Sequence, residues 1–183
     1  LQAQYDILLG RMSQAEKRWQ KVERHLPKVR LDYQLEISTD LALQKAMVSR
    51  LNEDWDLVKS ILIEADARDW PSEFLHKRLE LLRCLLFLHA ELGEWDQVEE
   101  VYRVANNLVP NNDNFAKASW TMHYAATLAK KGDAKKALEQ YLSVLDFFKS
   151  DLAKPFYKHH FFQDMLHVLV QNAGNEVFSS VLK

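Results

Sequence analysis

The stretch Leu92-Gly93-Glu94-Trp95-Asp96-Gln97-Val98, which continues to Val109-Pro110-Asn111-Asn112, decides the fold of this chain. Gly93 ends an apolar helical segment, because glycine readily adopts the left-handed conformation found after helix C-termini. A second helix follows, and Pro110 ends it, since proline cannot continue a helix. The same order of helix end, turn, helix and stop recurs at Gly10 and Gly132. The stretch therefore predicts a chain built from repeated pairs of helices.

Turn markers divide the chain at nearly equal intervals. They are Gly10, Glu53, Gly93, Gly132 and Gly174, and by subtraction the intervals are 43, 40, 39 and 42 residues. A near-fixed period of this size, with a helix pair as its unit, is typical of an α-solenoid. One pair cannot bury its apolar face alone, so neighbouring pairs stack. We therefore predict an all-α fold, an α-solenoid of antiparallel helix pairs.

The predicted units belong to a single domain that spans residues 1–183. They cover about residues 1–27, 29–70, 72–110, 113–150 and 155–183. The chain starts without Met and enters partway through a helix, which leads us to expect a fragment of a larger protein.

Three local features predict where helices begin and break. Ser13 followed by Glu16 has the spacing of a capping box, in which both side chains satisfy free amides at the start of a helix. The run Ser38-Thr39-Asp40 predicts a break inside a long segment, residues 29–51. Beyond Gly132, Ala137, Tyr141 and Leu145 line one continuous helix in this interpretation.

Composition narrows the class of protein. The chain has 183 residues, of which 48% are hydrophobic and 27% charged, with four glycines and four prolines. Few helix breakers favour a helical chain. The net charge of −2 argues against nucleic acid as the main partner. Cys84 has no internal disulfide partner and lies in an apolar run. There is no visible signal peptide or membrane-length apolar stretch, so we expect a cytoplasmic protein.

The repeat resembles the tetratricopeptide repeat (TPR) family. That family ends its first helix at Gly, then places an aromatic residue, a small one, a large one, Ala and Pro at fixed positions in the second helix. One stretch of this chain fits nearly all of these positions, with Gly93, Trp95, Val98, Tyr102, Ala105 and Pro110. The units at Gly10, Glu53 and Gly132 fit most of them, whereas the unit at Gly174 fits poorly. The period of about 40 residues exceeds the family's usual 34, which implies longer helices.

The resemblance implies a right-handed superhelix whose concave groove is lined by the first helix of each pair. In this chain the groove residues would be Glu80, Arg83, Phe87 and Glu91 in one unit, and Ser119, Met122 and Lys130 in the next. An apolar patch flanked by charges suits an amphipathic helix or an extended peptide. The alternative is that Phe87 and Met122 pack between repeats. Some TPR domains clamp a terminal carboxylate, but Phe87 and His123 stand where the clamp asparagines should be, so we reject that mode.

Other clusters have simpler explanations. His160, Asp164 and His167 share a helix face at i, i+4, i+7, but a fourth ligand and a metalloprotease general base are missing, so we predict no metal. Residues 11–30 carry a net charge of +5, and an acidic patch runs from Glu91 to Glu100. Such charges could dock an opposite partner, but more often they form a solvated face. No phosphate loop, nucleophile elbow or paired-carboxylate motif is present.

The sequence thus favours a non-enzymatic protein–protein interaction module that captures a partner peptide or helix. The alternative is a ligand- or peptide-sensing regulatory domain of a larger signalling or transcription-regulatory protein, with a small-molecule effector. An enzyme that uses the His160 cluster is a third and weaker hypothesis. We expect a protein or peptide partner, and no cofactor, direct nucleic-acid contact or membrane.

Overall fold

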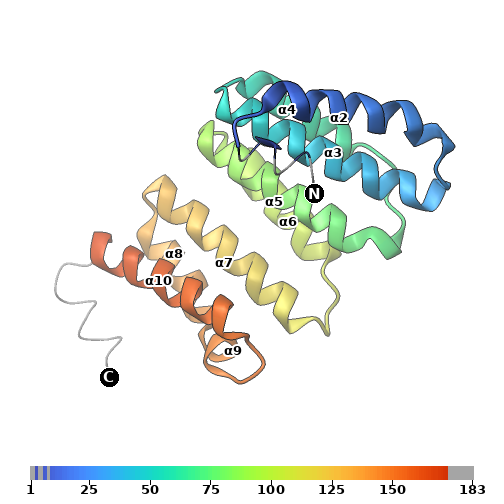
Figure 1. Cartoon of the computed structure of the whole chain (residues 1–183). Coiled ribbons are helices and arrows are strands. Elements are labelled where there is room, and N and C mark those ends of the chain that lie inside the picture. Colours follow the sequence, from blue (N-terminus) through green and yellow to red (C-terminus); the bar gives the residue numbers. More distant parts are fainter. Residues whose placement is uncertain (1–2, 4–5, 8, 173–183) are drawn as a thin grey trace. The chain divides into compact units, whose positions relative to one another are not determined.

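The computed structural model describes residues 3, 6–7 and 9–172 of the chain. Every regular element among these residues is a helix (Figure 1). The prediction of an all-α fold is therefore confirmed for this part of the chain. None of the helices within it is both long and apolar enough to cross a bilayer. The predicted turn at Ala173–Gly174 and the predicted last helix, Asn175–Lys183, lie outside the described residues.

The helices follow one another with short connections. The α-helices are α2 (Met12–His25), α3 (Leu31–Leu51), α4 (Trp55–Asp66), α5 (Leu75–Glu91), α6 (Trp95–Leu108), α7 (Asn114–Lys131), α8 (Ala134–Ser143), α9 (Leu145–Lys149) and α10 (Pro155–Asn172). Two short 3-10 helices, η1 (Leu26–Lys28) and η2 (Ser72–Phe74), follow α2 and precede α5.

The fold divides into two compact units, Leu1–Leu85 and Leu86–Lys183. The first contains α2, α3, α4 and the larger part of α5. The second contains the end of α5 and the helices from α6 to α10. One continuous solenoid over residues 1–183 stays a prediction.

The same type of backbone hydrogen bond forms at four of the predicted turn markers. At each, the N–H of the residue after the marker donates to the carbonyl five residues earlier, which closes the helix end as in a Schellman motif. The bonds run from Arg11 to Asp6, from Asp54 to Ser49, from Glu94 to His89 and from Asp133 to Leu128, over 2.7, 2.9, 2.9 and 3.0 Å. These markers therefore make the same type of turn.

The turn requires a left-handed residue at the marker. Gly10, Gly93 and Gly132 have φ values of 70°, 71° and 88°. Glu53 occupies the corresponding position with a φ of 59°, and it is the only residue other than glycine with a positive φ in the described part of the chain. Side chains adopt this region at a cost, because Cβ approaches the carbonyl oxygen. Glu53 thus takes the turn conformation without the residue that suits it.

In the first unit, α2 packs through a small apolar cluster. Ala15 and Trp19 of α2 are buried together with Leu41 and Val48 of α3. The Trp19 indole Nε1 also donates a hydrogen bond to Gln44 Oε1 over 3.1 Å. On the next helix, Val58, Leu62 and Ala65 are buried, and α4 packs along α3.

In the second unit, each helix packs against its sequence neighbour, and α8 also packs against α10. α6 packs against α7, and α7 packs against α8. Small residues permit the close approach of these helices: Ala105, Ala125 and Ala137 are fully buried. Phe148 and Phe161 stack in the core, with ring centroids 4.2 Å apart.

Three local predictions differ from the structure. α2 begins at Met12 with Arg11 at its N-cap and no side-chain cap, so the Ser13–Glu16 capping box does not form. The predicted break at Ser38–Asp40 is absent, because the hydroxyls of Ser38 and Thr39 donate to the Leu35 carbonyl inside a continuous α3.

The third difference is a break where one helix was predicted beyond Gly132. α8 ends at Ser143, and α9 starts at Leu145 after Val144, which has φ −114° and ψ 4°. Phe148 of α9 is fully buried and stacks on Phe161. The break therefore redirects an aromatic side chain into the core, which the local sequence pattern does not reveal.

Replacing Glu53 with Gly should stabilise the protein. The left-handed conformation costs a residue with a side chain about 1–2 kcal/mol, and glycine avoids this cost. Glycine also raises the conformational entropy of the unfolded chain, which offsets part of the gain in stability. We expect the free energy of unfolding to rise by about 0.5–1 kcal/mol in urea denaturation. Gly132→Ala is the matched control: no neighbour lies within 4 Å of an added Cβ, so backbone strain alone should destabilise it. A less stable Glu53→Gly variant would contradict this interpretation of the turn.

Candidate functional site

α7 is the most deeply packed helix of the second unit. It begins at Asp113, whose side chain accepts a hydrogen bond from the Ala116 amide over 2.9 Å, and it ends at the left-handed Gly132. Its buried residues are Ala118, Trp120, Met122, Tyr124, Ala125, Thr127 and Leu128. These leave one side of the helix free of buried residues, so a continuous strip on that side stays accessible. Outside this strip, Lys117, Thr121 and Ala129 are also partly accessible.

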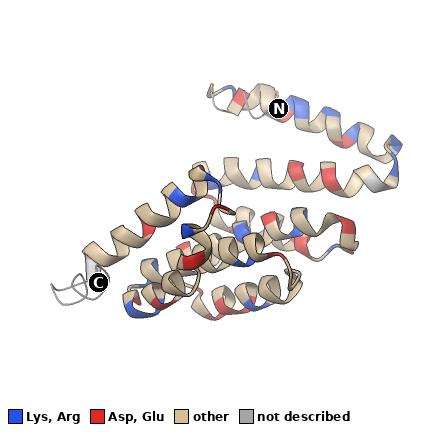
Figure 2. Ribbon diagram, turned by 90° about the horizontal axis from the view of Figure 1, so that it is seen from below, with Lys and Arg blue, Asp and Glu red and all other residues tan. Residues whose placement is uncertain are grey.

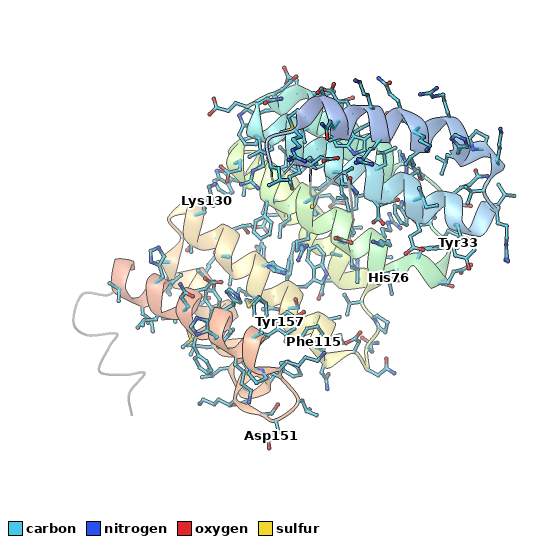
Figure 3. All side chains as sticks on the ribbon, viewed as in Figure 1. Tyr33, His76, Phe115, Lys130, Asp151 and Tyr157 are labelled. Atoms are coloured by element: carbon cyan, nitrogen blue, oxygen red, sulfur yellow. The ribbon has the colours of Figure 1, made fainter. Side chains whose placement is uncertain are left out.

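The accessible strip runs nearly the whole length of α7. Its members recur at helical spacing and are all at least partly exposed: Phe115, Ser119, His123, Ala126 and Lys130. We call these five residues the α7 stripe. Figure 3 shows Phe115 and Lys130 at opposite ends of the helix. At 1.5 Å per residue, the stripe extends over about 22 Å.

Side chains from the neighbouring first helices border the stripe at both ends. Phe87 of α5 packs edge-to-face on His123, with ring centroids 5.6 Å apart. One turn further along α5, Glu91 forms an ion pair with Lys130. At the other end, Phe115 meets Tyr157 of α10 with centroids 4.9 Å apart (Figure 3). The border thus combines exposed aromatic rings with one pair of opposite charges.

Five of the seven predicted groove residues lie in the second unit, and four of these border or belong to the stripe. Phe87, with 36% of its surface exposed, and Glu91 border it. Ser119 and Lys130 belong to it. Met122 is 6% exposed and is buried inside the unit. For this residue the structure therefore agrees with the alternative prediction of packing between repeats.

The other two predicted groove residues, Glu80 and Arg83, lie on the part of α5 that belongs to the first unit. Glu80 is half-buried, and its carboxylate lies 3.4 Å from the Lys77 ammonium. That ammonium is also 2.6 Å from Asp40 of α3. Arg83 is exposed. In the first unit Glu80 therefore takes part in a network that ties α5 to α3.

Three residues at the site, Phe115, His123 and Tyr157, were not among the predicted groove residues. A signal for two of them was present, because Phe115 and His123 lie four residues before and after the predicted Ser119 on the same helical face. Tyr157 had no such signal, since only the packing of α10 beside α7 brings it to Phe115.

Behind the stripe, an aromatic stack fixes α7 against α6. The rings of Tyr102 and Tyr124 are nearly parallel, with centroids 3.9 Å apart and an interplanar angle of 7°. The Tyr124 hydroxyl donates to Glu99 Oε2 over 2.5 Å. Burial raises the pKa of Tyr124 well above its ordinary value, and the Glu99 carboxylate adds to the shift. Tyr124 therefore stays protonated and keeps its hydrogen bond at physiological pH.

The His160 cluster lies on α10. His160 and His167 are exposed, and Asp164 is half-buried. Burial raises the pKa of Asp164, while the two histidines oppose that shift. The described residues contain no group of three or more His, Cys, Asp or Glu side chains arranged to hold a metal ion.

Tyr141 of α8 is fully buried, and its hydroxyl has no hydrogen-bond partner in the described part of the structure. Its ring packs edge-to-face on Phe161 with centroids 5.6 Å apart. Burial raises the pKa of Tyr141, and the Asp164 carboxylate adds to the effect. The ring thus contributes packing, whereas the hydroxyl loses its hydration without compensation.

Replacing Tyr141 with Phe should therefore stabilise the protein. An unpaired buried hydroxyl costs about 1–3 kcal/mol, and phenylalanine keeps the ring. We expect a higher free energy of unfolding in urea for Tyr141→Phe. The matched control is Tyr124→Phe, which removes a satisfied hydroxyl and should lower stability by about 1 kcal/mol. Equal effects of the two substitutions would contradict the difference in hydrogen bonding.

Asp164→Asn should change the pH dependence of stability. The folded protein holds the pKa of Asp164 above the unfolded value, so ionisation of this group lowers stability as pH rises through the folded pKa. Asparagine does not ionise, so the variant does not lose stability in this way. We expect Asp164→Asn to be more stable than the wild type at neutral pH, and the difference to shrink as pH falls below about 4. Thermal melts at several pH values measure this, and a pH-independent difference would contradict it.

No family model, curated protein or solved structure matches this chain.

Proposed function

We propose that the second unit binds a peptide segment of a partner protein along the α7 stripe. The observation that carries this proposal is the exposure of Phe87 and Phe115, at 36% and 38%, in a row that the Glu91–Lys130 ion pair closes at one end. Partly exposed aromatic rings are enriched among residues that anchor protein interfaces. Ser119, a polar and partly exposed residue of the stripe, offers a hydrogen bond to a peptide.

The packing order supports a TPR-like solenoid in this unit. α8 packs against α7, the first helix of its own pair, and against α10, the first helix of the next pair. α6 packs against α7 in the same way. The ring contact of Phe87 with His123 joins α5 to α7, and that of Phe115 with Tyr157 joins α7 to α10. First helices therefore lie side by side, as the right-handed TPR superhelix requires for its concave groove.

The dimensions and charges of the stripe suggest the kind of peptide. Its length of about 22 Å equals about fifteen residues of helix or seven of extended chain. Apolar side chains of the peptide would cover Phe87 and Phe115. An acidic residue at the Lys130 end would compete with Glu91 for the ammonium. An amphipathic segment with an acidic end meets both conditions, and the mechanism is capture without bond chemistry.

Selection from a displayed library of random peptides tests the proposal. The selected peptide is titrated calorimetrically against the wild type, Phe87→Ala and Lys130→Glu. We expect Phe87→Ala to weaken binding by about tenfold or more, because truncation of an aromatic anchor commonly costs 2 kcal/mol or more. Lys130→Glu should weaken the binding of a peptide with an acidic end and strengthen that of its lysine-ended analogue.

The control keeps the fold and changes another surface. Arg103→Ala removes an exposed side chain of α6 that pairs with Glu100, and it should leave the affinity unchanged. Circular dichroism confirms equal helicity for all variants. A library without binders, or binders that are sensitive to Arg103→Ala and insensitive to Phe87→Ala, would refute the α7 stripe as the site.

A further inference from the structure

The first unit carries a row of cations along the outer side of α2 and into the short helix η1 that follows it. Lys17, Lys21, Arg24 and Lys28 follow one another at i, i+4, i+7 and i+11, and all four are exposed. At 3.6 residues per turn, Lys17, Lys21 and Arg24 are confined to about a sixth of the circumference of α2, and Lys28 is the last residue of η1. We call these residues the cationic stripe. Figure 2 shows blue segments along α2, the helix beside the N mark.

The opposite side of α2 holds the helix in place. Ala15 and Trp19 are buried against α3, and Trp19 also makes its hydrogen bond to Gln44. The cationic stripe therefore belongs to a packed helix and faces away from the core of its unit.

Two carboxylates near the cationic stripe pair with cations outside it. Glu23 of α2 accepts from Lys45 of α3 over 2.5 Å. Asp6 accepts from Arg18 over 2.6 Å, although Arg18 itself lies outside the stripe. Among the described residues, no carboxylate forms an ion pair with Lys17, Lys21, Arg24 or Lys28. Within the described part of the unit, the four charges thus have no ion-pair partner.

The uncompensated row opposes helix formation. Like charges at i, i+4 destabilise a helix by about 0.2–0.5 kcal/mol per pair. The C-terminal dipole of α2 favours Arg24 in its last turn and Lys28 just beyond it, but the effect falls off within the last turn. The dipole does not stabilise the charges of Lys17 and Lys21, which lie before the last turn. A bound anion would remove this repulsion.

We propose that the cationic stripe binds an acidic segment of another protein, on a surface separate from the α7 stripe. The three cations of α2 recur about 4.5–6 Å apart along the helix. Acidic side chains on one side of an extended chain recur about every 6.6 Å, and those at i, i+4 of a helix about every 6 Å. An acidic peptide of either form therefore presents carboxylates to several stripe residues at once.

Two other anions fit the observations less well. The net charge of the chain is −2, which repels a polyphosphate backbone outside the stripe. Membrane-surface helices insert an apolar face, whereas the buried Ala15 and Trp19 of α2 already contact the protein core. A short acidic peptide needs neither a large basic field nor an exposed apolar face.

Fluorescence anisotropy with a labelled peptide of alternating glutamate and serine tests the proposal at low salt. The stripe variant carries Lys17→Gln, Lys21→Gln and Arg24→Gln. The control variant carries Lys135→Gln, Lys149→Gln and Lys154→Gln, three exposed lysines of the second unit, and so has the same net charge. We expect the stripe variant to bind about tenfold more weakly than the wild type, since several modest exposed ion pairs are lost together, and the control to bind within about twofold of the wild type.

Comparison probes decide between the classes of anion. A glutamine–serine peptide should not bind, and added salt should weaken the glutamate peptide. Absence of binding to the wild type, or equal losses in the two variants, would overturn the proposal. Tighter stripe-dependent binding to duplex DNA or to phosphatidylserine vesicles would also overturn it, since the partner would then not be an acidic protein segment. Circular dichroism establishes that the stripe variant keeps its helices.

Discussion

The structure depends on one backbone turn that recurs along the chain. A helix ends when the residue after the turn marker donates its N–H to the carbonyl five residues earlier, and the marker itself takes a positive φ. The bond satisfies a carbonyl that the helix end would otherwise leave free. It also reverses the chain within about two residues, so the next helix begins beside the one that has ended. Without this turn, long apolar segments such as α7 would have no neighbour to cover them.

Burial on several sides follows from this arrangement and determines the candidate site. α7 has α6, α8 and α10 as neighbours. Ala118, Met122 and Ala125 are buried, whereas the residues of the α7 stripe stay at least partly accessible. The Tyr102–Tyr124 stack and the Glu99 hydrogen bond fix this helix from behind. A partner that binds along the stripe would therefore meet a preorganised surface, which lowers the entropy cost of binding.

The two units use charge differently. In the second unit, Glu91 pairs with Lys130 and Glu100 with Arg103, so much of the predicted acidic patch is compensated. In the first unit, the cationic stripe along α2 and η1 has no such partners among the described residues. The formal charge of a sequence segment is thus a poor guide to its effective charge. The pairing of side chains from different helices decides what a partner meets.

The sequence alone determined the helical class, the turn positions and most helix ends, because these depend on local chemistry. Glycine, proline and apolar spacing act within a few residues, and even Glu53 was located by the period. The continuity of α3 through Ser38 and Thr39 escaped prediction, since hydroxyls can bond the preceding turn as readily as they cap a new one.

Only the tertiary structure decided which side chains of α7 are covered and which are accessible. Periodicity separates apolar from polar positions, but small and apolar residues occur on every side of this helix, so its pattern cannot show which sides neighbours will cover. Met122 is buried and His123 lies at the surface for that reason. The contacts of Phe115 with Tyr157 and of Glu91 with Lys130 join residues some forty positions apart. They exist because one helix packs beside another, a geometry that no local pattern contains.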